Sequence, residues 1–251
     1  MKDYIATIVK NEKIAENIHA VTFDLGEKAE VRCGQFGNIS VEGTHLLRRP
    51  IAICKVEDTK VTFCYQIKGE GTQKLKTMGA GARLNVLLPL GNGFFIEEHE
   101  KKIALVGGGV GVFPLISVLR EYGKEKEISA YIGYRNYGAV CGVDEFEKAQ
   151  KFVGVTDDGS YGEKMNAVQA FEADLKKGNR PDVVLACGPT PMLRALKALV
   201  QRENLPCYVS LEERMGCGIG ACLVCVCNLT NGQHARVCKD GPVFNANDVE
   251  I

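Results

Sequence analysis

The N-terminal part of the chain alternates short apolar runs with turn-forming residues, which is typical of an antiparallel β domain. The runs are rich in β-branched and aromatic residues, and turn residues such as Gly26, Gly43 and Asp58 separate them. This pattern favours a small antiparallel barrel over residues 1–98. The expected strands are residues 4–9, 18–25, 37–41, 50–55, 60–67 and 83–88.

Strand and helix patterns alternate in the next part of the chain, residues 99–211. A glycine-containing tract at residues 90–94 separates this part from the barrel. The alternation predicts an α/β domain with a parallel sheet and helices on both faces. The expected strands are residues 103–106, 128–134, 152–155, 182–187 and 207–211, and the expected helices are residues 113–122, 144–150, 162–175 and 191–203.

The last part of the chain, residues 212–251, carries four cysteines in an informative spacing. Cys217, Cys222 and Cys225 form a C-x4-C-x2-C run, and Cys238 follows at a distance. This is the spacing of a plant-type [2Fe–2S] cluster, and the glycines between the cysteines suit a tight loop around it. A segment this short buries little core by itself, so the cluster and contacts with the other domains are expected to hold it.

Two other interpretations of these cysteines stay open from the residues alone. Zinc sites usually combine two close cysteine or histidine pairs, whereas only Cys222 and Cys225 form a close pair here. Alternatively, the cysteines are small buried residues, which is the interpretation adopted for Cys227 on a neighbouring strand. The spacing favours the iron–sulfur cluster, and therefore a protein that transfers electrons.

The composition argues against several classes of protein. The chain has 251 residues with 31 basic and 31 acidic side chains, and this zero net charge argues against a general nucleic-acid or membrane-surface binder. Its 11 cysteines and a start (MKDYIATIVK) without the apolar core of a signal peptide favour a reducing cytoplasm over a disulfide framework. No apolar run approaches the roughly 18 residues of a membrane span.

Two glycine-containing turns are expected to bind a dinucleotide at the ends of parallel strands. In the first, the absence of side chains would let a pyrophosphate approach backbone N–H groups at the start of a helix. Val112 departs from the standard G-x-G-x-x-G fingerprint, so an ordinary tight turn stays an alternative. In the second, Cys187 either leaves room for a flat ring or faces the core. The candidate residues are Gly107, Gly108, Gly109, Gly111, Cys187, Gly188 and Pro189.

Two stretches of the expected barrel have features of a phosphate site. Arg49 precedes Pro50 before a strand, and its guanidinium is a forked donor that suits a pyrophosphate. Further on, a strand ends in a glycine turn after which a helix is expected at residues 73–77, with Thr72 as its cap. From spacing alone, a solvated turn is the simpler interpretation of the arginine–proline pair.

The order of these segments resembles the ferredoxin-reductase superfamily. Residues 48–52 (RRPIA), 107–114 (GGGVGVFP) and 187–192 (CGPTPM) precede LEERMGCGIGACLVCVC and RVCKDGPVF, which resemble the electron-transfer subunits of class 1B dihydroorotate dehydrogenase. The resemblance covers the full chain and implies a barrel that binds FAD, an α/β domain that binds NAD and a tail that holds the cluster. Ala52 stands where the family usually has Ser, which removes a hydroxyl near the flavin. The implied FAD residues are Arg49, Pro50, Ile51, Ala52, Gln66, Ile67, Lys68, Gly71 and Thr72, and the implied cluster ligands are Cys217, Cys222, Cys225 and Cys238.

The resemblance also implies a function and a partner. Electrons would pass from the FMN of a separate dihydroorotate dehydrogenase catalytic subunit through the [2Fe–2S] cluster and FAD to NAD⁺, in de novo pyrimidine (UMP) biosynthesis. The two kinds of subunit would form a cytoplasmic heterotetramer of two plus two, with no nucleic acid and no membrane. Such a role needs no base for the substrate, which agrees with four scattered histidines, namely His19, His45, His99 and His234.

Two alternative functions stay open. Small flavin and iron–sulfur subunits of ferredoxin:NADP oxidoreductases and sulfide dehydrogenases are similar in outline, although some have Asp in place of a cluster cysteine. A scaffold with a structural metal and no flavin is the other alternative.

The roles of three acidic residues and one arginine also stay open from the sequence. Arg135 either meets a 2′-phosphate or is solvated, and Glu212-Glu213 lies either at the flavin–nicotinamide junction or in a solvated turn. Asp157 ends an expected strand near the nucleotide.

Overall fold

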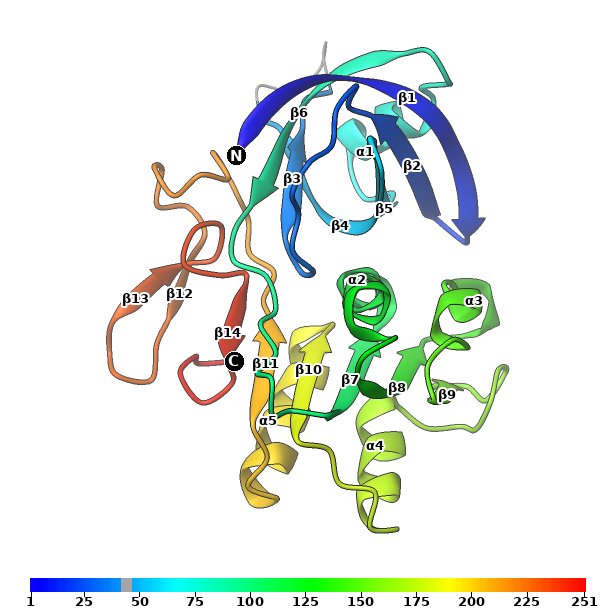
Figure 1. The fold of residues 1–251 in the computed structure, drawn as a ribbon, viewed down its shortest axis with the longest axis vertical. Coiled ribbons are helices and arrows are strands. Elements are labelled where there is room, and N and C mark those ends of the chain that lie inside the picture. Colours follow the sequence, from blue (N-terminus) through cyan, green and yellow to red (C-terminus); the bar gives the residue numbers. More distant parts are fainter. Residues whose placement is uncertain (42–46) are drawn as a thin grey trace.

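A computed structural model of the protein describes residues 1–41 and 47–251, so Gly43 and His45 lie outside the described residues. Figure 1 shows three parts: a barrel, a sheet covered by helices, and a C-terminal segment of loops and short strands beside the sheet. The predicted order of a barrel, an α/β sheet and a cysteine-bearing tail is confirmed.

Among the described residues, six antiparallel strands close the barrel. They are β1 (Lys2–Ala15), β2 (Ile18–Asp24), β3 (Phe36–Ile39), β4 (Arg49–Glu57), β5 (Lys60–Gln66) and β6 (Arg83–Leu90). The order around the barrel is β1-β2-β5-β4-β3-β6. Inward-facing residues form the core, where the rings of Phe23 and Phe63 pack edge to face with centroids 5.9 Å apart. Helix α1 (Glu70–Lys76) adds Leu75 to this core.

Strand β1 is longer than predicted, because it pairs with two neighbouring strands. Its first half pairs with β6 from Lys2 to Thr7, and its second half pairs with β2 from Thr7 to Ala15. Residues 10–13 are polar, so the apolar pattern ends before the strand does.

The second part is a sheet with helices on both faces. Its elements are β7 (Lys102–Gly108), β8 (Glu127–Tyr134), β9 (Lys151–Thr156), β10 (Val183–Cys187), β11 (Cys207–Ser210), β14 (Val243–Asn245), α2 (Val112–Tyr122), α3 (Val143–Phe146), α4 (Ala167–Leu175) and α5 (Thr190–Arg202). The strand order is β14-β11-β10-β7-β8-β9, and only the edge strand β14 is antiparallel to its neighbour. Apolar residues of α2 and α3 pack on one face, and those of α4 and α5 on the other.

Two helices are shorter than predicted. Helix α4 begins at Ala167 rather than at residue 162, because Asn166 caps it. The Asn166 side chain accepts the N–H of Gln169, whose side chain accepts the N–H of Asn166 in return. Helix α3 covers only the first part of the predicted range 144–150.

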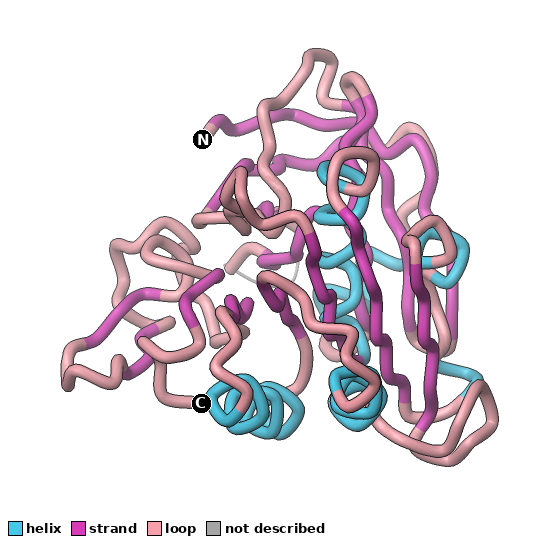
Figure 2. The backbone as a smooth tube through the Cα atoms, turned by 60° about the horizontal axis from the view of Figure 1, so that its bottom comes forward, coloured by secondary structure: helices cyan, strands magenta, loops and turns pink. Residues whose placement is uncertain are grey.

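The C-terminal segment is tied to the sheet as well as folded on itself. Strands β12 (Val226–Asn228) and β13 (His234–Arg236) form an antiparallel pair, and β14 then joins the sheet beside β11, with Phe244 opposite Val209. Figure 2 shows the segment as loops with short strands beside the sheet. The sheet therefore anchors a segment that has little core of its own.

The barrel packs directly on helix α2. Strand β4 lies against α2, and Cys54 and Cys64 of the barrel share one apolar cluster with Phe113 and Ile116 of the helix. This contact fixes the relative position of the two domains.

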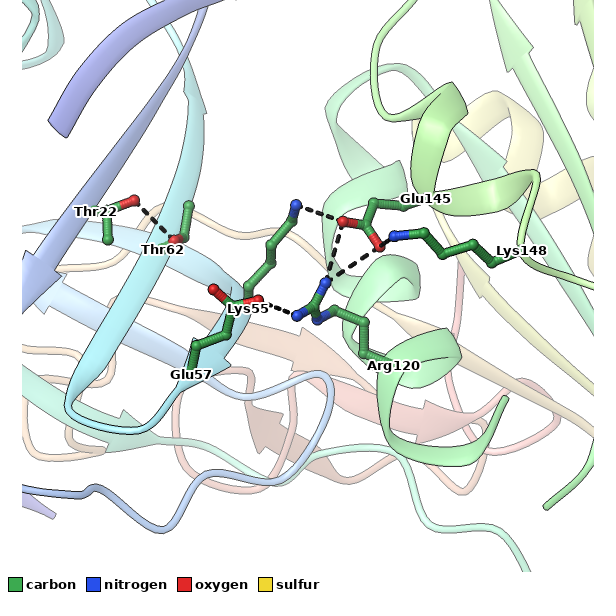
Figure 3. A network of polar contacts seen from close by, with 7 residues as sticks. All are labelled: Thr22, Lys55, Glu57, Thr62, Arg120, Glu145 and Lys148. Carbon is green, nitrogen blue, oxygen red and sulfur yellow. Dashed lines mark hydrogen bonds and ion pairs between the residues drawn. The ribbon is translucent and has the colours of Figure 1, made fainter. Parts of the chain in front are cut away.

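Glu145 lies at the centre of a polar network that crosses this contact (Figure 3). Its carboxylate accepts hydrogen bonds from Lys55 of β4 at 2.5 Å, Lys148 at 2.8 Å and Arg120 of α2 at 3.1 Å. Arg120 also pairs with Glu57 of the barrel. Burial acts to raise the pKa of Glu145, but the hydrogen bonds from Lys148 and Lys55 and the nearby positive charges outweigh it and lower the pKa to about 2.

Replacing Glu145 by Gln is expected to destabilise the protein by about 3 kcal/mol, because Lys55 and Arg120 lose a carboxylate that is only 5% exposed. Urea unfolding at neutral pH measures this loss. Glu172→Gln is the control, since Glu172 pairs with Lys176 and Arg202 at the surface and little change is expected there.

The lowered pKa of Glu145 also predicts a pH dependence. A carboxyl group whose pKa falls from 4.5 to about 2 on folding stabilises the protein above pH 4.5 and loses this effect as the pH falls towards 2. The difference in unfolding free energy between the wild type and E145Q is therefore expected to shrink over that range. An unchanged difference at the acid end would contradict the ion-pair interpretation.

Candidate functional site

A cleft of about 290 Å³, the central cleft, lies where all three parts of the protein meet. The barrel, the ends of the sheet and the start of the C-terminal segment each form one wall. Its lining includes Arg49, Pro50, Ile51, Ala52, Tyr65, Gln66, Lys68 and Thr72 of the barrel, Phe113, Pro114, Cys187 and Ser210 of the α/β domain, and Glu212, Glu213 and Met215. Most of the predicted flavin residues are thus brought to one place.

A second cleft of about 670 Å³, the sheet-end cleft, lies at the carboxyl ends of the parallel strands. Its lining includes five of the predicted nucleotide residues, namely Gly108, Gly109, Gly111, Gly188 and Pro189. Gly107 lies instead beneath helix α2, where a Cβ atom would be 2.8 Å from Cδ1 of Leu115. Its glycine is therefore needed for packing rather than for an open approach to the cleft.

The two glycine turns contact each other through their backbones. A Cβ atom at Gly111 would lie 2.5 Å from the carbonyl oxygen of Cys187 and 2.6 Å from the nitrogen of Gly188. The register of β10 on β7, with Cys187 opposite Gly107, brings the turns together. The turns therefore form one continuous floor of backbone groups.

A third cleft of about 510 Å³, the outer cleft, lies at the start of helix α1. Its lining includes Leu47, Arg49, Lys68, Gly71 and Thr72. A Cβ atom at Gly71 would lie 2.0 Å from Nε of Arg49, so only glycine lets the guanidinium lie over the start of the helix.

The predicted cap of this helix is wrong. Helix α1 begins at Glu70 rather than at residue 73, and Gly69 is its N-cap. Thr72 lies inside the helix, and its hydroxyl accepts the N–H groups of Lys68 at 3.0 Å and Gly69 at 3.2 Å. A glycine has no side chain to cap the helix, so Thr72 stabilises the turn from the third helical position.

The three clefts are connected through shared residues. Arg49, Lys68 and Thr72 line both the outer and the central cleft, and Gln66, Lys68 and Glu212 line both the central and the sheet-end cleft. Ile67 is the predicted flavin residue that lines none of them, and its N–H donates to the carbonyl of Asn17 at 2.9 Å. Glu212 thus lies at the junction of the central and the sheet-end cleft.

Cys187 lies in the wall of the central cleft and is 2% exposed. Burial and the charge of Glu212 raise the pKa of its thiol to about 12, although a hydrogen bond with Ser210 acts in the opposite direction. The thiol is therefore neutral at physiological pH, which suits contact with a ring better than a role as a nucleophile.

The cysteine loop brings its four predicted ligands together as two pairs. The backbone N–H of Cys217 donates to Sγ of Cys222, and the backbone N–H of Cys238 donates to Sγ of Cys225. Backbone N–H groups also point at the sulfur atoms. These donors are Ile219 and Ala221 to Cys217 (3.4 and 3.3 Å), Gly220 to Cys238 (3.1 Å), Cys217 to Cys222 (3.3 Å) and Cys238 to Cys225 (3.4 Å).

These backbone donors change the acidity of the loop. Burial acts to raise the pKa of the Cys217 thiol, but the N–H groups of Ile219, Cys222 and Ala221 lower it to about 6. Burial, reinforced by the neighbouring Cys225, raises the pKa of Cys238 to about 12. A thiolate at Cys217 is the charged form that binds metal.

The arrangement of the four cysteines suits an iron–sulfur cluster. Two pairs of cysteines match a two-iron cluster, in which four cysteines are shared between two irons. Cys227 lies on β12 and is buried, as predicted.

Several residues at these clefts carry no motif in the sequence. Glu16 and Asn17 of the β1–β2 turn line the sheet-end cleft, and Tyr65 and Ser210 line the central cleft. Only the pairing of distant strands places them there. No helix in the described ranges is long and apolar enough to cross a membrane.

The barrel, the sheet with its joined glycine turns and the cysteine loop together define an electron-transfer protein of the ferredoxin-reductase class. A solved structure titled as an NADH-dependent reduced ferredoxin-NADP oxidoreductase is similar over 98% of this chain and 90% of that chain, with a TM-score of 0.85 and 27% identity.

The sequence comparisons are more specific. Residues 212–250 match the model of the iron–sulfur cluster binding domain of dihydroorotate dehydrogenase B. The electron transfer subunit of dihydroorotate dehydrogenase B (NAD(+)) from Caldanaerobacter subterraneus subsp. tengcongensis is 37% identical over 97% of both chains. The subunit from Bacillus pumilus is 39% identical over 100% of this chain and 99% of its own. The chain belongs to the family of dihydroorotate dehydrogenase B electron transfer subunits.

Replacing Cys225 by Ser is expected to abolish the iron content and the visible absorbance of the purified protein, because one iron loses a sulfur ligand. Cys227→Ser is the matched control, since Cys227 is also buried and stands two residues away but takes no part in either pair. Iron and sulfide analysis of both variants measures the effect. Equal cluster loss in both variants would contradict the assigned ligands.

Proposed function

We propose that the protein carries electrons from a catalytic dihydroorotate dehydrogenase subunit, through a [2Fe–2S] cluster and FAD, to NAD⁺. The observation that supports this function is the continuity of the sites. Residues 210–217 run past the central cleft and into the cysteine loop, and Glu212 on this stretch also lines the sheet-end cleft. One short segment therefore links three places where redox groups fit.

FAD fits the central and outer clefts. Ile51, Tyr65 and Phe113 offer apolar surface in the central cleft, and Arg49 beside the outer cleft is a forked donor for a pyrophosphate. When bound, a flavin can exchange electrons both singly and in pairs. Ala52 lines the central cleft without the usual hydroxyl. The residues proposed to hold FAD are Arg49, Pro50, Ile51, Ala52, Gln66, Lys68, Gly71 and Thr72.

NAD fits the sheet-end cleft. The glycine turns line this cleft at the starts of α2 and α5, where helix N-termini favour a phosphate. The position at the carboxyl ends of parallel strands is where open α/β sheets bind ligands. Glu212 lines both this cleft and the central cleft, and Cys187 lines the central cleft beside Gly188 of this one. Both residues are proposed to position the nicotinamide against the flavin.

The cluster fits the cysteine loop. Cys217 and Cys222 are proposed to bind one iron, and Cys225 and Cys238 the other. The backbone hydrogen bonds from Cys217 to the sulfur of Cys222 and from Cys238 to the sulfur of Cys225 support this assignment. The N–H groups directed at the sulfurs would stabilise their negative charge.

An apolar patch on the cysteine loop supports a protein partner. Residues 215–227 contain no aspartate, glutamate, lysine, arginine or histidine, although the whole chain is 25% charged. Four apolar residues of this patch are exposed, namely Ile219 (43%), Leu223 (64%), Val224 (56%) and Val226 (37%). Leu223 also has a left-handed backbone with a φ of 58°, which is unusual for leucine. Such a patch is typical of an interface, and we propose that the FMN-containing catalytic subunit covers it in a heterotetramer of two plus two.

A ferredoxin:NADP oxidoreductase subunit is the second candidate. It is favoured by the TM-score of 0.85 to the oxidoreductase structure described above. The two candidates differ in the donor that supplies electrons through the cluster.

The protein mixed anaerobically with the dihydroorotate dehydrogenase catalytic subunit of the same organism is expected to reduce NAD⁺ at the expense of dihydroorotate. Neither subunit alone should do so, because the proposed function divides the reaction between them: the catalytic subunit oxidises dihydroorotate and this chain passes the electrons to NAD⁺. The appearance of NADH absorbance measures the reaction. NADH oxidation with an artificial acceptor, without any coupling to dihydroorotate, would instead favour the ferredoxin-linked candidate.

Leu223→Asp is expected to weaken binding of the catalytic subunit by at least about tenfold, because it places a charge in an apolar interface. Ile5→Asp is the matched control, since Ile5 is 65% exposed but lies on barrel strand β1. Sedimentation of the mixed subunits measures the complex, and the cluster spectrum checks folding. Equal binding by both variants would place the partner elsewhere.

A further inference from the structure

The turn between β1 and β2 brings the barrel onto the nucleotide side of the molecule. Glu16 and Asn17 form this turn, and both line the sheet-end cleft together with Arg135, Asn136 and Asp157 of the α/β domain. The barrel thus contributes a carboxylate to a cleft whose glycine turns belong to the other domain.

Backbone contacts fix the position of Glu16. Its N–H donates to the carbonyl of Gly138 at 2.9 Å, across the boundary between the two domains. A Cβ atom at Gly138 would lie 2.9 Å from Oε2 of Glu16, so the carboxylate lies directly beside this turn. On the other side, the carbonyl of Asn17 accepts the N–H of Ile67 at 2.9 Å. The backbone of the turn that carries Glu16 is therefore held at the cleft from both sides.

Glu16 lies at the end of the cleft that would hold the adenosine. The nicotinamide must reach the junction with the central cleft, which is marked by Lys68 and Glu212. The glycine turns between the ends suit the pyrophosphate. The adenosine would then bind at the ends of β8 and β9, beside Arg135 and Asp157. Gly138 contacts Glu16 at the same end of the cleft.

The charges at this end favour a neutral ribose. Glu16 and Asp157 are two carboxylates, and Arg135 is the one cation among these residues. None of the three takes part in an ion pair among the described residues, so their charges act on whatever enters the cleft. A 2′-phosphate would bring further negative charge against two carboxylates, whereas a 2′-hydroxyl can donate a hydrogen bond to one of them.

We propose that Glu16 is a specificity-determining residue that the barrel supplies to the nucleotide site. With Asp157, it favours the 2′-hydroxyl of NAD over the 2′-phosphate of NADP. The proposal rests on the proposed function, because it places a dinucleotide in the sheet-end cleft.

The test compares binding of NAD⁺ and NADP⁺ to the purified protein by calorimetry at low salt. Glu16→Gln keeps the size of the side chain and the backbone N–H, and is expected to tighten NADP⁺ binding roughly fivefold while NAD⁺ binding changes less than about twofold. The gain should shrink at high salt, because Glu16 is exposed and its charge is screened. Glu12→Gln is the matched control, since Glu12 lies on the same strand, pairs with Lys10 and lines none of the three clefts.

An unchanged ratio of NADP⁺ to NAD⁺ affinity in Glu16→Gln would overturn the proposal. So would a shift confined to Asp157→Asn, because the barrel turn would then only form the rim of the cleft. An equal shift in Glu12→Gln would show a general charge effect and would also overturn it. Nucleotide binding is measured without dihydroorotate or the catalytic subunit. Its result therefore does not depend on whether the coupled reaction of the proposed function succeeds.

Discussion

The contact between the barrel and helix α2 is the constraint on which the other sites depend. Strand β4 carries Arg49 and Ala52 at one end, and its further course packs on α2 with Lys55 bonded to the buried Glu145. The same helix follows the glycine-rich turn of the sheet. A rotation of the barrel on α2 would therefore separate the walls of the central cleft and remove Glu16 from the sheet-end cleft. The ion pairs of the buried Glu145 with Lys55 and Arg120 resist such a rotation, because breaking them would leave a buried charge without a partner.

The stretch from Ser210 to Cys217 connects the sheet to the cysteine loop. It leaves the sheet at the end of β11, passes the central cleft and enters the cysteine loop. Strand β14 returns to pair with β11, so both ends of the C-terminal segment are fixed at the same strand. On the barrel side, Nδ2 of Asn38 donates to the carbonyl of Cys217 at 3.2 Å. The cysteine loop is thus held against both domains, and its outer face stays open.

Local patterns were sufficient for much of the fold. The barrel strands, the alternation of strands and helices and the spacing of the four cysteines follow from residues close in sequence, and the structure agrees with them. Errors occur where a local pattern has a different cause. The polar second half of β1 is a strand because β2 pairs with it, and Gly107 is a glycine because Leu115 packs on it. Thr72 stabilises α1 from within, since Gly69 takes the cap position.

The sequence by itself determined the kinds of chemistry that this protein can perform. Cysteine spacing, glycine turns and an arginine before a proline are short-range features, because the atoms of one cluster or one phosphate span only a few residues. Tertiary structure alone decided how these features are joined. The connection of three clefts, the position of Cys238 beside Cys225 and the presence of Glu16 and Asp157 at one cleft depend on strand register and on domain packing. These contacts link residues far apart in the chain, and no local pattern records which distant partner a residue will meet.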